Sequence, residues 1–189
     1  MEIGLHPGYF AGSDPHAFLE ERRRLEQVTG EPVESVRNHY LRWHPINTPQ
    51  LLHSYGIRID ATLGYAEQEG FRRGTCHPFR LYDLQNERPL DVWEMPLLVM
   101  DSTLFGYRAL EVEGALEATR RILLQVERFR GAAVMLWHPI LYDPFDHSGW
   151  HLHFERTLGV VQERGGAVLS LRGAMDGGWE VGVSDQNRV

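Results

Sequence analysis

The chain has 189 residues, of which 42% are hydrophobic, and a formal net charge of -7 at neutral pH. This composition predicts a globular protein with a sizeable core and excludes a disordered chain. The acidic balance argues against a nucleic-acid partner, and the single cysteine, Cys76, excludes an internal disulfide and a cysteine zinc cluster. Because no apolar run approaches the roughly 18 residues of a membrane span and no secretory signal opens the sequence, we predict no membrane span and a cytoplasmic location.

Strand and helix patterns alternate in the first half of the chain. Asp14-Pro15 is a helix start, with a capping residue before a proline, and Gly30 is the corresponding stop. A second helix is predicted over residues 48–56. The short apolar segments around these helices predict strands at 3–5, 33–36 and 57–61.

The second half continues this alternation after a less regular segment over residues 62–91. Strands are predicted at 79–82, 92–100, 132–137 and 167–171, and helices at 112–129 and 150–164. Pro96 marks its strand as an edge or bulged strand. Alternating strands and helices indicate parallel strands with helical crossovers, arranged as an open sheet or a barrel. We expect a single α/β domain over residues 1–175 and a polar tail over 176–189.

Titratable side chains follow several of the predicted strands. They are His6, Arg37, His39, Asp60, Asp101 and His138. Because the carboxyl ends of parallel strands lie at one edge of a sheet, we expect these side chains to converge there. Imidazole and carboxylate ligands together suit a divalent metal such as zinc, manganese, iron or cobalt. A further histidine beside a carboxylate suits general acid catalysis near neutral pH.

Each of these residues also has a structural interpretation. His6 is explained equally by a turn that ends a strand, and His39 by a core histidine bonded to the backbone. Arg37 pairs naturally with one of the two aspartates, and Asp101 is a typical cap for the helix that follows it. His138 favours a functional interpretation, because it follows a wholly apolar strand and precedes a proline-rich loop. The three histidines further along are expected at the surface: His147, His151 and His153.

Three segments occur in the order of the motifs of the polysaccharide deacetylases, the NodB-homology group or carbohydrate esterase family four. They are Glu2-Ile3-Gly4-Leu5-His6, Arg37-Asn38-His39-Tyr40 and Leu136-Trp137-His138. The sequence between Arg37 and Asp101 resembles a bacterial deacetylase-like branch more closely, at Gly64-Tyr65, Gly70-Phe71-Arg72, Pro78-Phe79 and Met95-Pro96-Leu97. The resemblance spans residues 1–165. It implies a distorted (β/α) barrel of about seven strands, a TIM-like fold, and the metal-assisted removal of acetyl groups from N-acetylated sugars.

The resemblance also implies a role for each candidate residue. The metal ligands are His6 and, in place of the family's motif proline, His39, with zinc as the first choice of metal. Arg37 orients a catalytic carboxylate, and His138 is the general acid toward the leaving amine. Either Asp60 or Asp101 tunes that histidine. The carbohydrate substrate is expected to contact Tyr9, Tyr40 and Trp137.

The sequence departs from the family pattern at two places. Phe10 stands where the family has its second metal histidine, and the motif that supplies an aspartate pair has no equivalent before His6. We therefore expect a barrel that lacks its first strand or strands, with an exposed edge that favours a homodimer. The favoured function is a hydrolase of carbon–nitrogen bonds other than peptide bonds. The alternative is a degenerate carbohydrate-binding or structural relative without a cofactor.

Overall fold

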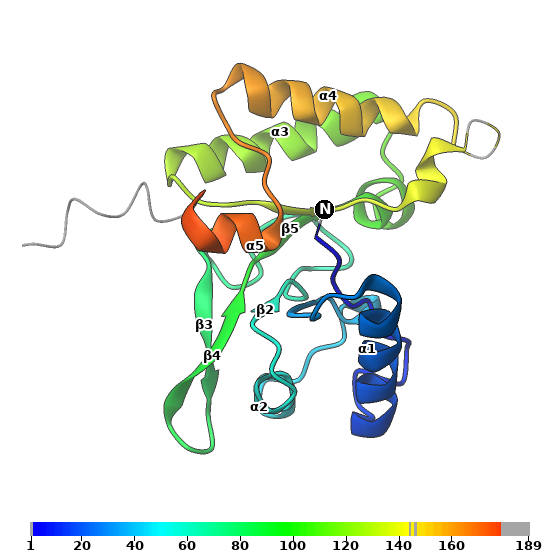
Figure 1. Cartoon of the computed structure of the whole chain (residues 1–189). Coiled ribbons are helices and arrows are strands. Elements are labelled where there is room, and N and C mark those ends of the chain that lie inside the picture. The colour runs from blue at the N-terminus through cyan, green and yellow to red at the C-terminus, as the bar shows by residue number, and fades with distance from the viewer. Residues whose placement is uncertain (1, 144, 146, 179–189) are drawn as a thin grey trace, which may run out of the picture. The chain divides into compact units, whose positions relative to one another are not determined.

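The structure is a computed structural model that describes residues 2–143, 145 and 147–178 (Figure 1). Its internal contacts divide the chain into two compact units. The first unit comprises the described parts of Met1–Leu63, His77–Pro96 and Ser170–Val189, and the second comprises Gly64–Cys76 and Leu97–Leu169. The expectation of one domain over residues 1–175 stays a prediction. The tail expected over 176–189 lies almost wholly outside the described residues.

The first unit contains a mixed sheet of four strands in the order β1-β2-β4-β3. Strands β1 (Ser35–Val36), β2 (Ile59–Asp60) and β4 (Arg88–Glu94) are parallel, whereas β3 (Phe79–Asp83) pairs with β4 as an antiparallel hairpin. The register places Asp60 opposite Glu94, so the two carboxyl groups occupy neighbouring strand ends.

Two helices accompany this sheet: α1 (Pro15–Thr29) and α2 (Asn47–Ser54). The cap of α1 is the expected one, since the Asp14 side chain accepts hydrogen bonds from two backbone N–H groups of the first turn and Gly30 ends the helix in the left-handed region at φ 73°. The core of this unit consists of Leu5, Ala11, Phe18, Val33, Val36, Leu52, Ile57, Leu81, Leu90 and Val92.

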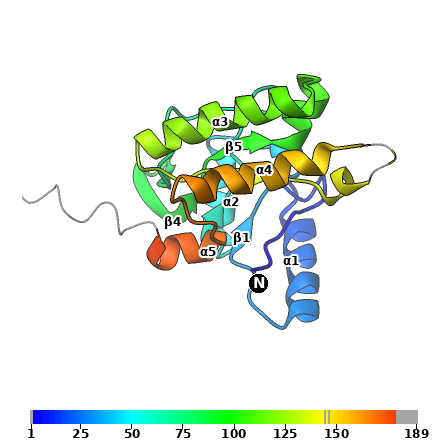
Figure 2. The ribbon, with the colours of Figure 1, turned by 90° about the horizontal axis from the view of Figure 1, so that it is seen from above.

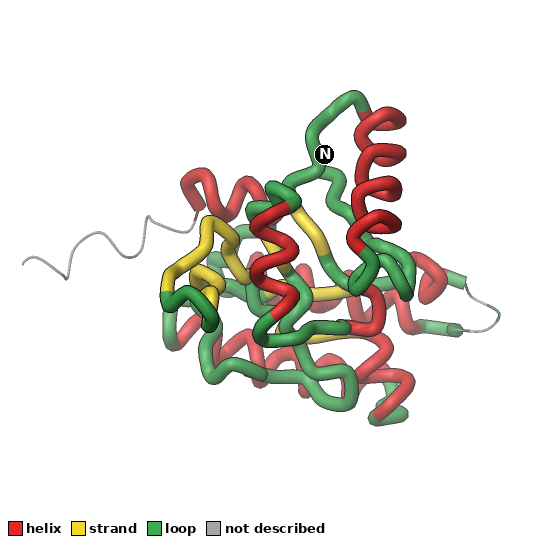
Figure 3. The backbone as a smooth tube through the Cα atoms, turned by 90° about the horizontal axis from the view of Figure 1, so that it is seen from below, coloured by secondary structure: helices red, strands yellow, loops and turns green. Residues whose placement is uncertain are grey.

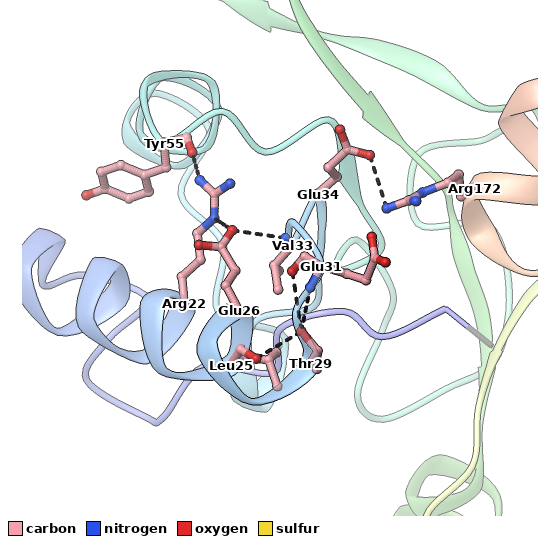
Figure 4. Close-up of polar contacts among 9 residues, drawn as sticks. All are labelled: Arg22, Leu25, Glu26, Thr29, Glu31, Val33, Glu34, Tyr55 and Arg172. Carbon is pink, nitrogen blue, oxygen red and sulfur yellow. Dashed lines mark hydrogen bonds and ion pairs between the residues drawn. The ribbon is translucent and has the colours of Figure 1, made fainter.

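Polar contacts fix the end of α1 to the segment that enters β1 (Figure 4). Glu26 accepts hydrogen bonds from the backbone N–H of Val33 at 3.0 Å and from Arg22 Nε at 2.9 Å. The Arg22 guanidinium also donates to the carbonyl of Tyr55, just beyond α2. The start of β1 is therefore held by both helices through one arginine and one glutamate.

The second unit contains the parallel pair β5 (Leu97–Met100) and β6 (Val134–Leu136) with the helices α3 (Val112–Arg128) and α4 (Trp150–Glu163). The two helices lie side by side (Figures 1 and 2). Their shared core consists of Cys76, Leu98, Val99, Leu104, Phe105, Ala115, Ala118, Val126 and Leu141.

Three of the predicted strands need correction. The opening strand at 3–5 is only an isolated bridge between Leu5 and Val36, and Ile3 is 41% exposed. The strand at 92–100 is two strands, because Pro96 has no N–H to donate and separates β4 from β5. The strand at 167–171 is absent: its residues lie outside any sheet, and the short helix α5 (Leu171–Gly173) begins where that strand was to end.

The C-terminal described segment is held to the first unit by Arg172. Its backbone N–H donates to Glu2 at 2.8 Å, and its guanidinium pairs with Glu34 at 3.2 Å (Figure 4). Glu2 accepts a second hydrogen bond from the hydroxyl of Ser35 at 3.0 Å. These contacts favour a helical turn at this point over a further strand.

The α/β class is confirmed, but the strands of the described residues form two open sheets and no closed one. Strands are short compared with the helices and loops throughout (Figure 3). The antiparallel hairpin β3–β4 also departs from the expected purely parallel arrangement. No helix in the described part of the chain combines the length and apolar composition needed to cross a bilayer.

Gly131 allows a close approach that no larger residue permits. A Cβ placed there would lie 2.8 Å from the carbonyl oxygen of Cys76 and closer still to its Sγ. We predict that Gly131→Ala lowers the free energy of unfolding by about 1–3 kcal/mol, measured by urea denaturation. The control is Gly159→Ala in α4, where a Cβ meets nothing within 4 Å; this substitution should stabilise the chain by about 0.5–1 kcal/mol. Equal stability of the two variants would contradict the prediction.

Candidate functional site

A buried aspartate and a half-exposed histidine form a hydrogen-bonded pair in the second unit. Asp101 directly follows β5, and His138 lies two residues beyond β6, the parallel neighbour of β5. The Asp101 side chain is 1% exposed, and the His138 side chain is 42% exposed. His138 Nδ1 lies 2.7 Å and 2.9 Å from the two carboxylate oxygens. Because a carboxylate only accepts, Nδ1 carries the hydrogen and Nε2 is free to exchange a proton with a bound molecule.

Asp101 accepts hydrogen bonds both from the turn that follows it and from His138. It caps the turn that follows β5, accepting from the N–H and hydroxyl of Ser102, and it also accepts from the backbone N–H of His138 at 2.5 Å. The carboxylate therefore fixes both the backbone and the ring of His138. Such a buried partner orients an imidazole for acid–base chemistry.

Trp137, the residue before His138, is partly buried against the core of the second unit. Its ring stacks on His153 with centroids 4.9 Å apart and meets Phe105 edge-on at 5.9 Å. The expectation that Trp137 contacts a substrate stays a prediction.

His153 corrects an expectation of the sequence, since it is fully buried and not at the surface. Its Nε2 lies 2.8 Å from the Thr119 hydroxyl on α3. Burial, the largest cause, lowers the pKa of His153 to about 4. The signal that identifies it is helical spacing: Trp150, His153 and Thr157 recur at intervals of three and four along α4 and so lie on one face.

A second polar cluster lies at the strand ends of the first unit. Asp60 is fully buried and accepts from the indole N–H of Trp43 at 3.0 Å and from the backbone N–H of Thr62 at 3.1 Å. Arg37 is half-buried, and its Nε donates to the carbonyl of Ala61 at 3.0 Å. Burial lowers the pKa of Arg37, while the charge of Asp60 acts to raise it. Of the two aspartates that the sequence offered to Arg37, Asp60 is thus the one that interacts with it.

Glu94 belongs to this cluster and was not identified from the sequence. It is fully buried, and its Oε1 accepts from the backbone N–H of Leu63 at 2.9 Å. The signal that could have found it is the alternation of β4, where Leu90, Val92 and Glu94 share the buried face. A lone carboxyl group on a buried strand face is unusual unless it is paired.

The two candidate metal ligands lie together at the surface of the first unit. The rings of His6 and His39 have centroids 4.6 Å apart, and His6 Nδ1 lies 2.7 Å from the carbonyl oxygen of Arg37. Within residues 2–143, 145 and 147–178, however, no group of three or more histidine, cysteine or acidic side chains is placed to hold a metal ion. A catalytic zinc takes three protein ligands. The two imidazoles therefore do not fit a resident metal, and no step below is assigned to one.

An exposed aromatic surface adjoins these imidazoles, and we call it the aromatic patch: Tyr9, Phe10 and Tyr40. Tyr9 meets Phe10 and Tyr40 edge-on at 5.0 Å and 5.5 Å, and Tyr40 stacks on His39 at 4.8 Å. Phe10 is 74% exposed and Tyr40 is 71% exposed. Tyr40 and the following Leu41 both have a positive φ, 55° and 52°. Adjacent left-handed residues other than glycine are strained, and such strain is concentrated at functional sites.

The sequence-predicted residues thus gather in two places. In the first unit, five of them lie near one another, and Asp60 interacts electrostatically with one of the five, Arg37; the five are His6, Tyr9, Arg37, His39 and Tyr40. Asp101 and His138 form a pair in the second unit. Asp101 is therefore the aspartate that is hydrogen-bonded to His138, whereas Asp60 is the one that interacts electrostatically with Arg37.

Comparison with known proteins finds a likeness of fold. No protein-family model and no curated protein matches the sequence. Among solved structures, the chain is similar to a crystal structure of a provisionally assigned polysaccharide deacetylase from Mycobacterium smegmatis, with a TM-score of 0.64 and 21% sequence identity. The match covers 85% of this chain and 56% of that protein, so the chain spans little more than half of the other's length.

Proposed function

We propose that this chain is a hydrolase of the polysaccharide deacetylase type, which removes acetyl groups from N-acetylated sugars. The observation that carries the proposal is the hydrogen bond between the buried Asp101 carboxylate and the half-exposed His138 ring, at the ends of two adjacent parallel strands. The likeness of fold to the Mycobacterium smegmatis protein supports the same general function. The resemblance of the motifs adds the substrate class, a carbohydrate that carries an acetamido group.

The proposed chemistry assigns His138 to the leaving group. Water adds to the acetyl carbonyl and releases one proton to the solvent, the carbon–nitrogen bond of the resulting intermediate breaks, and acetate and a free amine are formed; His138 afterwards regains its proton from the solvent. The imidazolium form of His138 gives its Nε2 proton to the departing nitrogen, because an amide nitrogen is a poor leaving group until it is protonated. Asp101 holds the opposite ring nitrogen and so keeps Nε2 directed toward the substrate.

The aromatic patch is the proposed contact for the sugar rings. Exposed contiguous aromatic side chains mark binding surfaces, and the C–H face of a pyranose ring packs on such rings. The expectations of a divalent metal, a homodimer and a distorted barrel of about seven strands that lacks its first strand or strands are kept here as predictions of the resemblance.

The proposal is tested by acetate release. The purified chain is incubated with N-acetylglucosamine oligomers and, as the control, with the same oligomers after chemical deacetylation. Acetate release from the first substrate alone supports the proposal. Absence of release, with and without added zinc, cobalt or manganese, contradicts it.

A second candidate function is a carbohydrate-binding relative without activity. Two observations favour it: Phe10 occupies the position of a metal histidine, and the donor set beside it does not fit a metal. This function predicts that oligomers bind and are released unchanged. Tyr40→Ala should then weaken binding at least tenfold, or about 1.4 kcal/mol, by calorimetry, while Tyr142→Ala, a control at an exposed tyrosine of the second unit, leaves binding unchanged.

A further inference from the structure

Two carboxyl groups lie side by side in the interior of the first unit. Asp60 on β2 and Glu94 on β4 are register partners on adjacent parallel strands, and both are fully buried. Two ionised carboxylates on directly opposed residues of adjacent strands repel each other, and burial deprives both of water. One of the two groups must therefore hold a proton for the pair to be stable.

The hydrogen-bond donors around the pair decide which group is protonated. Asp60 accepts from Trp43 Nε1, from the backbone N–H of Thr62 and from the Thr62 hydroxyl, so both of its oxygens are occupied by donors. Glu94 receives one donor, the N–H of Leu63, on Oε1. Its Oε2 is buried and meets no hydrogen-bond donor among the described residues. A carboxylate surrounded by donors favours its charged form, and one that lacks them favours its acid form.

The local charge balance leads to the same assignment. The titratable neighbours of Glu94 are Asp60 from β2 and Arg37 beyond β1, whereas β3 places the uncharged Phe79 opposite it. With Glu94 neutral, the single charge of Asp60 balances that of Arg37. Burial, followed by the charge of Asp60, raises the pKa of Glu94 well above its ordinary value.

We propose that Glu94 is a protonated carboxylic acid at neutral pH, that its Oε2–H donates a hydrogen bond to Asp60, and that the single negative charge left on the pair positions the guanidinium of Arg37. Glu94 is buried and touches no substrate, so it is a positioning residue. Only the use of Arg37 at the site rests on the proposed function; the protonation does not.

The protonation is tested by infrared difference spectroscopy of the folded chain at pH 7. The wild type should show a carboxylic-acid C=O stretching band that is lost in Glu94→Gln. The control is Glu113→Gln, because Glu113 is exposed and paired with Arg156 and is therefore ionised; this variant should keep the band. If Glu94→Gln keeps every carboxylic-acid band of the wild type, the proposal is overturned.

The positioning of Arg37 is tested by the proton signal of its Nε–H in nuclear magnetic resonance. This signal should be protected from solvent exchange in the wild type, because Nε donates to Ala61. As the pH rises, protection should be lost with the same midpoint as the acid band. Glu94→Gln, which keeps a donor toward Asp60 but has no proton to lose, should remove this pH dependence. A transition that persists in Glu94→Gln, or one with a different midpoint, overturns the positioning role.

The kinetic arm separates the two proposals. If the chain is a deacetylase, Glu94→Gln should keep kcat within about threefold of wild type, since the side chain is neutral in both. A loss of more than a hundredfold in the folded variant would show that the carboxyl proton of Glu94 takes part in the chemistry, and would overturn the proposal. If the wild type releases no acetate, the proposed function fails alone, and the infrared and resonance results still decide the state of Glu94.

Discussion

Replacing His138 with alanine should reduce acetate release from N-acetylated oligosaccharides by a factor on the order of 10²–10⁴, the usual contribution of a positioned general acid. The loss should fall on kcat, because in the proposed mechanism His138 gives its proton in the transition state and adds little to the binding of the substrate. The side chain is 42% exposed, so its removal leaves no large cavity. The measurement is initial-rate kinetics on protein whose circular dichroism matches the wild type.

The matched control is His16→Ala, which removes an exposed imidazole on α1. It should leave kcat unchanged. Near wild-type turnover in a folded His138→Ala variant would rule out the assigned role. Because Asp101 acts through His138, Asp101→Asn should lower activity in the wild type but not further in the His138→Ala background.

The chain should lose stability in mild acid because of His153. In the folded state the pKa of this buried histidine is about 4, against an ordinary value of 6.5. At pH above 6.5 the ring is neutral in both states and its contribution is complete. As the pH falls from 6.5 toward 4, His153 becomes protonated in the unfolded chain but stays neutral in the folded chain, so the free energy of unfolding falls. Integrated over this interval, the loss is about 3 kcal/mol.

The measurement is urea denaturation at several pH values between 4 and 7. His153→Gln offers a side chain that still reaches Thr119 but does not titrate, so its unfolding free energy should vary less over this interval than that of the wild type. His151→Gln, two residues earlier on α4, is the control and should keep the full dependence of the unfolding free energy on pH. An identical pH profile in the wild type and His153→Gln would refute the prediction.

Local sequence signals predict the positions of the helices well. Asp14-Pro15 and Gly30 placed both ends of α1, because caps act through the few residues beside them. The hairpin β3–β4 was missed, since its turn lacks the usual Asn-Gly or Asp-Gly pair and instead holds Glu87 at a φ of 50°. The opening strand was overestimated because an apolar run cannot show that only Leu5 finds a partner.

The sequence is enough to name the individual candidate residues, but it does not show which of them contact one another. Asp101 and His138 stand out as strand-end residues, yet their contact depends on β5 and β6 being neighbours, a tertiary fact. His153 is expected at the surface from the sequence, and Glu94 is not among the candidate residues, for a different reason. The residue types of both favour the surface, although the spacing of their neighbours indicates a buried face.

The two hydrogen bonds that Asp101 makes to one residue have a consequence for protein design. One carboxylate holds the backbone amide and the ring of His138 at once, so the rotamer of the histidine is settled when the strands pair. The conformational entropy of ordering that ring is thus lost during folding, before any ligand binds. A designer who grafts this pair onto another parallel sheet therefore needs two adjacent strand ends in a register that lets one carboxylate reach both the amide and the ring of the histidine.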